Sequence, residues 1–162
     1  MTIEVVRMGP PWAEPVAALW TREFGSTRVA SNGLLHELLA LPTLVALHDD
    51  VFAGAVAYRF DGGGGCEVVG LASAVPAVGA GTALLEAVTA EARAVGCRRA
   101  WLVTTNDNLG ALRFYQLRGW RLAVLRVEEV TRARATLKPE IPARGVDAIP
   151  IRDEIELELP LG

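Results

Sequence analysis

Alternating or continuous apolar runs bounded by turn residues predict seven strands along the chain. Residues 2–7 alternate and end at a Gly-Pro-Pro sequence, which is typical of an edge strand. Over residues 151–159, Glu154, Glu156 and Glu158 share one face and apolar residues the other, so a half-buried strand is expected. The other five strands are expected over residues 43–47, 51–60, 66–72, 98–104 and 119–127, the first three as antiparallel neighbours.

Apolar residues at helical spacing predict four helices. The clearest covers residues 82–95, and Gly96 stands where a left-handed cap is expected. A second helix is expected over residues 12–24, and a third, less regular, over residues 31–41. The fourth follows a polar stretch at residues 105–108 and ends near residue 117. This order of elements predicts an α/β fold with a mixed sheet.

The composition fits a single folded domain over residues 1–162. Of the 162 residues 51% are apolar, and the net charge of −3 leaves no basic excess, so nucleic acid is not expected as a partner. The longest uncharged stretch, residues 68–85, contains three glycines and Pro76. We therefore expect a strand, a loop and a helix start there, and no membrane partner.

Two further observations bear on the expected location of the protein. Cys66 and Cys97 are isolated, so neither a metal site nor a disulfide framework is indicated. The first eleven residues contain no apolar core of a signal peptide. A reducing, cytoplasmic environment is expected.

The sequence Gly79-Ala80-Gly81-Thr82 lies between a predicted strand and the clearest helix. Backbone amides at a helix start can hold an anion such as a pyrophosphate. A tight turn that packs the helix on the sheet would explain the same glycines. The sequence has neither the Gly-Lys-Ser/Thr ending of a P-loop nor the third glycine of a dinucleotide fingerprint.

Downstream of this loop, Asn108 is followed by an Ala three residues later, by Phe-Tyr six and seven residues later, and by Gly-Trp eleven and twelve residues later. Together with Gly79-x-Gly81-x-x-Leu-Leu, this pattern resembles the GNAT N-acetyltransferase superfamily. A narrower resemblance, to a bacterial subgroup, rests on residues 66–69 and 104–108 and on a tail with Lys-Pro-Glu-Ile-Pro and Ile-Arg-Asp-Glu-Ile-Glu sequences.

The resemblance implies a mostly antiparallel central sheet with flanking helices, in which two parallel strands, residues 66–72 and 98–104, splay apart around acyl-CoA. Asn108 would hydrogen-bond the pantetheine arm, or it caps the next helix. Pro76 stands where the family usually has Arg or Gln, three residues before the first glycine, and Val78 is also apolar, so phosphate binding would rest on amides and the helix dipole. The cofactor-binding residues implied are Val78, Gly79, Ala80, Gly81, Thr82, Ala83 and Asn108.

The resemblance also assigns catalytic residues. Tyr115 would protonate the leaving thiolate of the cofactor, although a core aromatic would explain the same residue. Glu67 is the best-placed acceptor of the amine proton, with a solvated strand residue as the alternative. Asp107, as a base or a helix cap, and a bound water are the other candidates, and a structural role is expected for His36.

The resemblance therefore implies an N-acyltransferase that moves an acetyl group from acetyl-CoA directly to a small-molecule or peptide amine in a ternary complex. The competing interpretation is a module that binds or senses acyl-CoA without turnover. The acidic balance of the chain favours a cationic amine. For the tail, residues 128–162, an acceptor-side lid and a homodimer contact both stay open.

Overall fold

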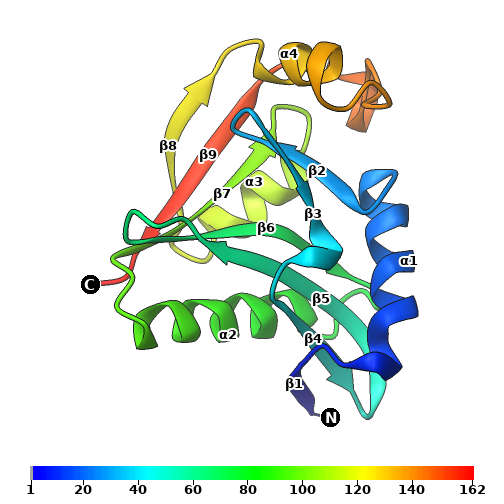
Figure 1. Cartoon of the computed structure of the whole chain (residues 1–162), viewed down its shortest axis with the longest axis vertical. Helices are drawn as coiled ribbons and strands as arrows, with labels where there is room; N and C mark the ends of the chain where they lie inside the picture. The colour runs from blue at the N-terminus through cyan, green and yellow to red at the C-terminus, as the bar shows by residue number, and fades with distance from the viewer. Residues whose placement is uncertain (1) are drawn as a thin grey trace.

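The computed structural model describes residues 2–162 and contains a seven-stranded sheet in the order β1-β4-β5-β6-β7-β9-β8 (Figure 1). Only β6 and β7 pair in parallel, and every other neighbouring pair is antiparallel. The strands of this sheet are β1 (Ile3–Arg7), β4 (Thr43–His48), β5 (Val51–Phe60), β6 (Gly65–Ser73), β7 (Arg99–Thr105), β8 (Arg121–Arg126) and β9 (Glu154–Pro160). The predicted mixed, mostly antiparallel sheet with flanking helices is confirmed.

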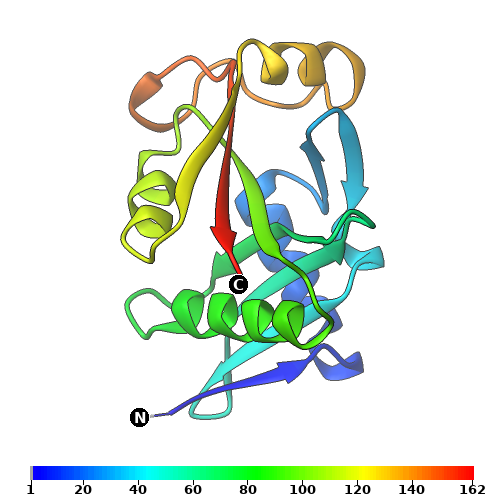
Figure 2. The ribbon, with the colours of Figure 1, turned by 90° about the vertical axis from the view of Figure 1, so that its left-hand side faces the viewer.

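Helices cover both faces of the sheet. Figure 2 shows α2 in front of the strands and α1 behind them. Leu84 and Val88 of α2 are fully buried against one face, and Val16 and Trp20 of α1 against the other. The helices are α1 (Ala13–Phe24), α2 (Ala80–Ala94), α3 (Leu109–Gln116) and α4 (Glu129–Thr136), with 3-10 turns at Pro10–Trp12, Leu38–Ala40 and Val146–Ala148. Residues 68–85 form a strand, a loop and a helix start as predicted, and no helix within residues 2–162 has the length and apolarity to cross a bilayer.

The prediction of a helix over residues 31–41 is wrong. This segment contributes to an antiparallel hairpin of β2 (Arg28–Ser31) and β3 (Leu34–Glu37). The two turn residues, Asn32 and Gly33, have φ of 50° and 81°. Positive φ at both positions suits an Asn-Gly hairpin turn, a local signal that outweighs the irregular helical spacing. In Figure 1 the hairpin crosses in front of β7.

The parallel pair β6–β7 separates partway along its length. Gly65–Val68 pair with Arg99–Leu102, and beyond these residues the two strands are not paired. On the other side of β6, Tyr58 pairs with Val68 but Ala57 pairs with Gly70, so Val69 forms a bulge. A bulge bends its strand and redirects the neighbouring side chains. The predicted splay is therefore present, and the bulge lies where it begins.

The last strand is not half-buried as predicted. Leu157 is fully buried on one face, yet Glu154 and Glu156 on the other face are only 2% and 4% exposed. The glutamate face is covered because Asn32 of the hairpin turn contacts Glu154, and because Arg126 and another arginine pair with Glu156. Alternation identified the strand correctly, but what covers each face depends on distant segments.

Candidate active site

A cleft of about 240 Å³ opens where β6 leaves β7. The end of β6, the amino-terminal end of α2 and one side of α3 form its walls, so it lies at the splay of the parallel pair. The residues that line it are Leu71, Ala72, Ser73, Gly81, Gly110, Ala111, Phe114 and Tyr115.

The loop at residues 78–83 forms the start of α2 beside this cleft. Gly79 has a φ of 85° and occupies the position before the helix, where it has no side chain to cap the first N–H groups. No acidic residue lies in the first turn, so the N–H groups and the positive end of the helix dipole are unopposed. Gly81 serves packing as well, since a Cβ there would lie 3.3 Å from the Phe114 ring. Both interpretations of these glycines therefore have a structural basis.

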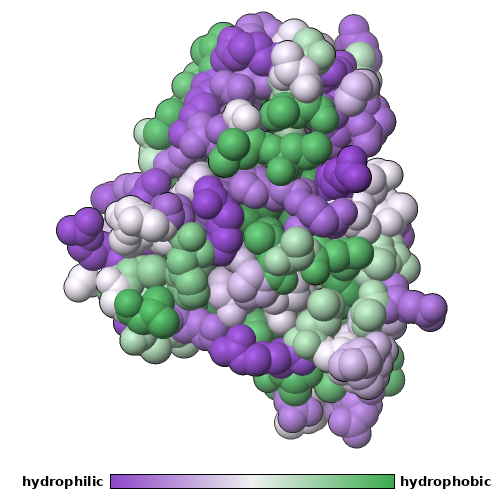
Figure 3. Space-filling model, in the orientation of Figure 1, coloured by the Kyte–Doolittle hydropathy of each residue, from purple (hydrophilic) through white to green (hydrophobic). Residues whose placement is uncertain are grey.

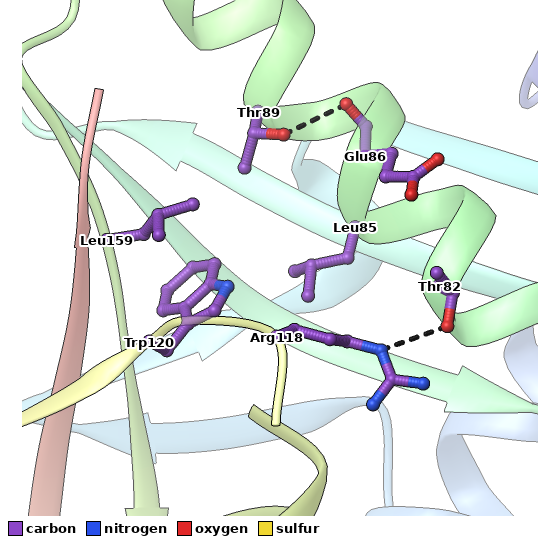
Figure 4. A pocket seen from close by; sticks show the side chains of 7 residues that line it. All are labelled: Thr82, Leu85, Glu86, Thr89, Arg118, Trp120 and Leu159. Atoms are coloured by element: carbon purple, nitrogen blue, oxygen red, sulfur yellow. Dashed lines mark hydrogen bonds between the residues drawn. The ribbon is translucent and has the colours of Figure 1, made fainter. Parts of the chain in front are cut away.

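The cation that this loop lacks is supplied from elsewhere in the chain. Pro76 and Val78 carry no charge, but the Arg118 Nε donates to the Thr82 Oγ1 at 3.0 Å, in the first turn of α2. The Arg118 guanidinium also stacks 3.6 Å from the centre of the Phe114 ring. Arg118 borders a second pocket, of about 270 Å³, between α2 and the start of β8 (Figure 4). Sequence reasoning missed Arg118 because 36 residues separate it from Thr82.

Tyr115 lies on α3 and lines the cleft. It is 8% exposed and packs against the rings of Phe114 and Trp120, at centroid distances of 5.2 and 5.6 Å. Its hydroxyl makes no hydrogen bond within residues 2–162. Burial raises the pKa of Tyr115 above its ordinary value of 10, so its phenol is neutral near pH 7 and can act only as a donor of its proton. The residue thus combines a core position with a wall of the cleft.

Asn108 caps α3, since its Oδ1 accepts the N–H of Ala111 at 3.2 Å. The neighbouring Asp107 neither caps this helix nor faces the cleft, so the expectation of a helix cap is wrong. It is 5% exposed, and its two oxygens accept from the Thr105 hydroxyl and the Val146 N–H. A Cβ on Gly145 would overlap the Asp107 carboxylate, so this carboxylate is closely fitted to the tail.

Glu67 lies on the opposite face of the sheet from Tyr115, next to the last paired residues of β6 and β7. It is only 1% exposed, so the alternative of a solvated strand residue is wrong. The Ser31 hydroxyl donates to its Oε2 at 2.6 Å, and the Arg59 Nε donates to its Oε1 at 2.7 Å. The His36 Nε2 lies 4.0 Å from the same Oε1. The β2–β3 hairpin thus encloses the carboxylate.

The tail completes this face of the molecule. The Lys138 ammonium, 6% exposed, donates to the carbonyl oxygens of Phe24 and Arg28 at 2.7 and 2.6 Å. The Asn106 Oδ1 accepts the N–H groups of Arg152 and Asp153, each at 3.0 Å. These contacts hold α4 and the following segment against α1, the hairpin and the end of β7. The sequence analysis did not predict α4.

Comparisons with known proteins agree with this geometry. Residues 11–120 match the acetyltransferase (GNAT) family. The Bacillus subtilis (strain 168) protein YxbD is 38% identical over 143 residues, which cover 88% of this chain and 89% of YxbD. An IAA acetyltransferase from Bacillus cereus ATCC 14579 has a TM-score of 0.74 at 18% identity, over 98% of this chain and 99% of that chain. A GNAT family acetyltransferase from Elizabethkingia anophelis with acetyl-CoA bound has a TM-score of 0.72 at 17% identity, over 98% and 97% of the two chains. This chain belongs to the GNAT acetyltransferase family.

Proposed function

We propose that the protein transfers an acetyl group from acetyl-CoA to an amine by direct attack in a ternary complex. The observation that supports this most is the cleft at the β6–β7 splay, because an uncapped helix start and the Tyr115 phenol both border it. The Elizabethkingia anophelis relative holds acetyl-CoA on the same fold. We further propose that the Lys-Pro tail marks a subgroup within the family.

In this proposal the pyrophosphate binds at the start of α2. The amides of residues 78–83 and the helix dipole attract it, and Arg118 adds the positive charge that Pro76 and Val78 cannot provide. The pantetheine arm follows the cleft past Asn108, whose side-chain NH₂ remains free to donate while its Oδ1 caps α3. The thioester then lies between the splayed strands, near the Tyr115 hydroxyl.

The transfer needs two proton movements. The acceptor arrives as an ammonium of pKa near 10.4 and must lose a proton before its nitrogen can attack. The nitrogen then bonds to the acetyl carbon, the C–S bond breaks, and the leaving thiolate takes the proton of the Tyr115 hydroxyl. The nitrogen of the new amide still carries one proton too many, and this proton passes to the Tyr115 oxygen and restores the phenol. Glu67, on the other face of the splay, assists removal of the first proton through its negative charge.

Direct transfer is favoured over a covalent enzyme intermediate. Cys66 is fully buried in the core, and burial raises the pKa of its thiol to about 12. Burial also raises the pKa of Cys97 above its ordinary value. A thiol rather than a thiolate is a weak nucleophile, so neither cysteine suits an acetyl-enzyme intermediate.

The acceptor proposed is a cationic small-molecule or peptide amine. Glu67 and Glu154 both lie buried beside the hairpin turn, and Glu154 has no basic side chain within salt-bridge distance among residues 2–162. The face of the molecule drawn in Figure 3 is mixed, with hydrophobic patches separated by hydrophilic bands. Such a surface suits an acceptor that carries both an apolar portion and a positive charge.

One observation favours binding of acyl-CoA without turnover. Both oxygens of Glu67 already accept hydrogen bonds, from Arg59 and Ser31, so the carboxylate is not free to meet an amine. A sensing module would keep the cofactor cleft and dispense with a free base. The retained Tyr115 in the cleft favours the enzyme.

Two measurements separate these functions. Acetyl-CoA should raise the melting temperature, because a ligand that binds only the native state stabilises it. Gly81→Asp should abolish this shift by placing a carboxylate where a phosphate approaches, and its melting temperature without ligand reports any packing loss. Mass spectrometry of cell metabolites incubated with protein and acetyl-CoA should then show acetyl additions. A thermal shift without any acetylated product would support the sensing module, and no shift at millimolar acetyl-CoA would contradict both.

A further inference from the structure

His36 lies on β3, on the side of the hairpin that faces Glu67. Its side chain is 10% exposed, and its Nε2 is buried without a hydrogen-bond partner within residues 2–162. A buried polar atom normally has a partner, so an unpaired ring nitrogen calls for an explanation. The Glu67 Oε1 lies 4.0 Å from this nitrogen. This distance is about 1 Å longer than a charge-assisted hydrogen bond.

The charged groups that face His36 are Glu67 on β6 and Arg59 on β5. The largest effect on the protonated ring is burial, which disfavours it. The negative charge of Glu67 favours the protonated ring, and the positive charge of Arg59 disfavours it. The net effect lowers the pKa of His36 below 6.5, so the ring is neutral near pH 7. A neutral imidazole has one free lone pair and is therefore ready to accept a proton.

Glu67 is a poor proton acceptor in comparison. The Arg59 guanidinium and the Ser31 hydroxyl donate to its two oxygens. A carboxylate that already accepts hydrogen bonds on both oxygens is not free to meet an amine, and its ion pair with Arg59 places it beside the ring of His36, where it can stabilise a cation. The other candidate, Asp107, is also occupied: its two oxygens accept hydrogen bonds from the Thr105 hydroxyl and from the Val146 N–H of the tail. Tyr115 lies on the opposite face of the sheet.

We propose that His36 accepts the proton of the incoming ammonium and that Glu67 is the positioning residue that stabilises the resulting imidazolium. In this arrangement the Nε2–H points at Glu67, and the other ring nitrogen, Nδ1, receives the proton. Of the two nitrogens, only Nε2 is among the buried side-chain atoms of residues 2–162 that have no hydrogen-bond partner. The neutral amine then attacks the acetyl carbon, and the His36 proton leaves to solvent after release of the thiol. This inference rests on the proposed acetyl transfer.

The chain offers a matched control, because it contains only two histidines. His48 ends β4 at the turn into β5, where its Nε2 lies 3.9 Å from Asp49. Arg59, which contacts Glu67, lies near the other end of β5. His48→Gln therefore changes a histidine remote from Glu67.

The first measurement needs no acceptor. In an NMR titration of the full chain, the His36 ring should titrate below pH 6.5, and Glu67→Gln should lower its midpoint further by removing the stabilising charge. An unmoved midpoint in Glu67→Gln would show that the carboxylate does not support the imidazolium, and would overturn the pairing.

The second measurement follows thiol release from acetyl-CoA with a fixed panel of ethylamine, ethanolamine, 1,4-diaminobutane and L-lysine. His36→Gln and His36→Asn should each lower kcat/KM by roughly 10² to 10⁴ near neutral pH, the range of general base catalysis, with the loss shrinking towards pH 10. Both should keep the acetyl-CoA thermal shift, which shows that they fold, and His48→Gln should match the wild type. Wild-type rates in the His36 variants, or a loss that is flat with pH, would overturn the role of His36 alone. An inactive wild type on every amine, with the thermal shift intact, would overturn this inference together with the proposed transfer.

Discussion

At the scale of single residues, burial decides which ionisable side chains are suited to move protons. Tyr115 and Cys66 are kept in their neutral forms because burial raises the pKa of each. His36 is kept neutral because burial lowers its pKa. Glu67 is equally buried but stays paired with Arg59. The face with Tyr115 thus offers a proton donor, and the face with His36 offers a proton acceptor.

Tyr115→Phe removes only the hydroxyl. Because that hydroxyl makes no hydrogen bond within residues 2–162, the melting temperature and the acetyl-CoA thermal shift should stay close to wild type. Turnover should fall by roughly 10² to 10⁴ if the phenol protonates the leaving thiolate. Steady-state kinetics of thiol release measure this, and an unchanged kcat would leave Tyr115 with a packing role only.

Glu67→Gln keeps the shape of the side chain and removes its charge. The chemical step should slow, and the defect should shrink as pH rises, because at higher pH more of the acceptor is already a free amine. Rates of both enzymes from about pH 6 to pH 10 test this. Ser31→Ala is the matched control, since it removes one hydrogen bond to the same carboxylate and leaves the charge. A mutant to wild-type ratio that does not change with pH would contradict a part in proton removal.

At the scale of elements, the start of α2 gathers its groups from two parts of the chain. Its own first turn supplies uncapped N–H groups, and the turn after α3 supplies Arg118. The ring of Phe114 lies against both Gly81 and the guanidinium, so α3 holds the two contributions together. A loop without a cation of its own can therefore still attract a pyrophosphate.

Arg118→Ala should weaken acetyl-CoA binding without slowing the chemical step, because the guanidinium donates hydrogen bonds to Thr82 and Phe114 at the proposed pyrophosphate site. We expect the KM for acetyl-CoA to rise about tenfold while kcat stays nearly unchanged. A tenfold change corresponds to about 1.4 kcal/mol, which is a typical contribution of one charge-assisted hydrogen bond. Arg113→Ala, which removes an exposed arginine of α3, is the control. Equal effects of the two variants would indicate a general loss of positive charge instead.

At the scale of the whole molecule, β9 sets the electrostatics of the face opposite α2. Burial raises the pKa of Glu154, whose carboxylate has the Asn32 N–H as partner. Burial also acts on Glu158 in the same direction, but hydrogen bonds from Arg99 and Arg121 outweigh it and lower its pKa. Two glutamates on one strand should therefore affect stability in opposite ways as pH changes.

The sign follows from the unfolded pKa of 4.5 of each glutamate. The contribution of Glu154 is present below this pH and is lost as pH rises through its raised pKa. The contribution of Glu158 is present above this pH and is lost as pH falls through its lowered pKa. As pH is raised from about 3 to about 7, the free energy of unfolding of Glu154→Gln should therefore increase relative to that of the wild type. That of Glu158→Gln should decrease relative to the wild type over the same range. Urea unfolding at several pH values measures both, and parallel changes in the two variants would contradict the assignment.

The elements whose signals are local could be predicted from the sequence alone. Apolar periodicity located the seven strands of the sheet and the helices α1, α2 and α3, because one buried face repeats every second or every third to fourth residue. The Gly79 and Asn108 motifs indicated the family that residues 11–120 match. The hairpin of residues 28–37 was also within reach, since Asn32-Gly33 is a strong turn signal that the helical interpretation overlooked.

Which side chains meet and which are buried became known from the folded arrangement of the chain. Glu67 looked equally suited to a solvated face, yet Ser31 and His36 of the hairpin enclose it. Asp107 looked like a helix cap, yet it holds the tail through Val146. Arg118 reaches the first turn of α2 from 36 residues away. The physical reason is common to all of these: the environment of a charge depends on groups brought together by chain reversals, and periodicity carries no information on which distant segment will cover a given face.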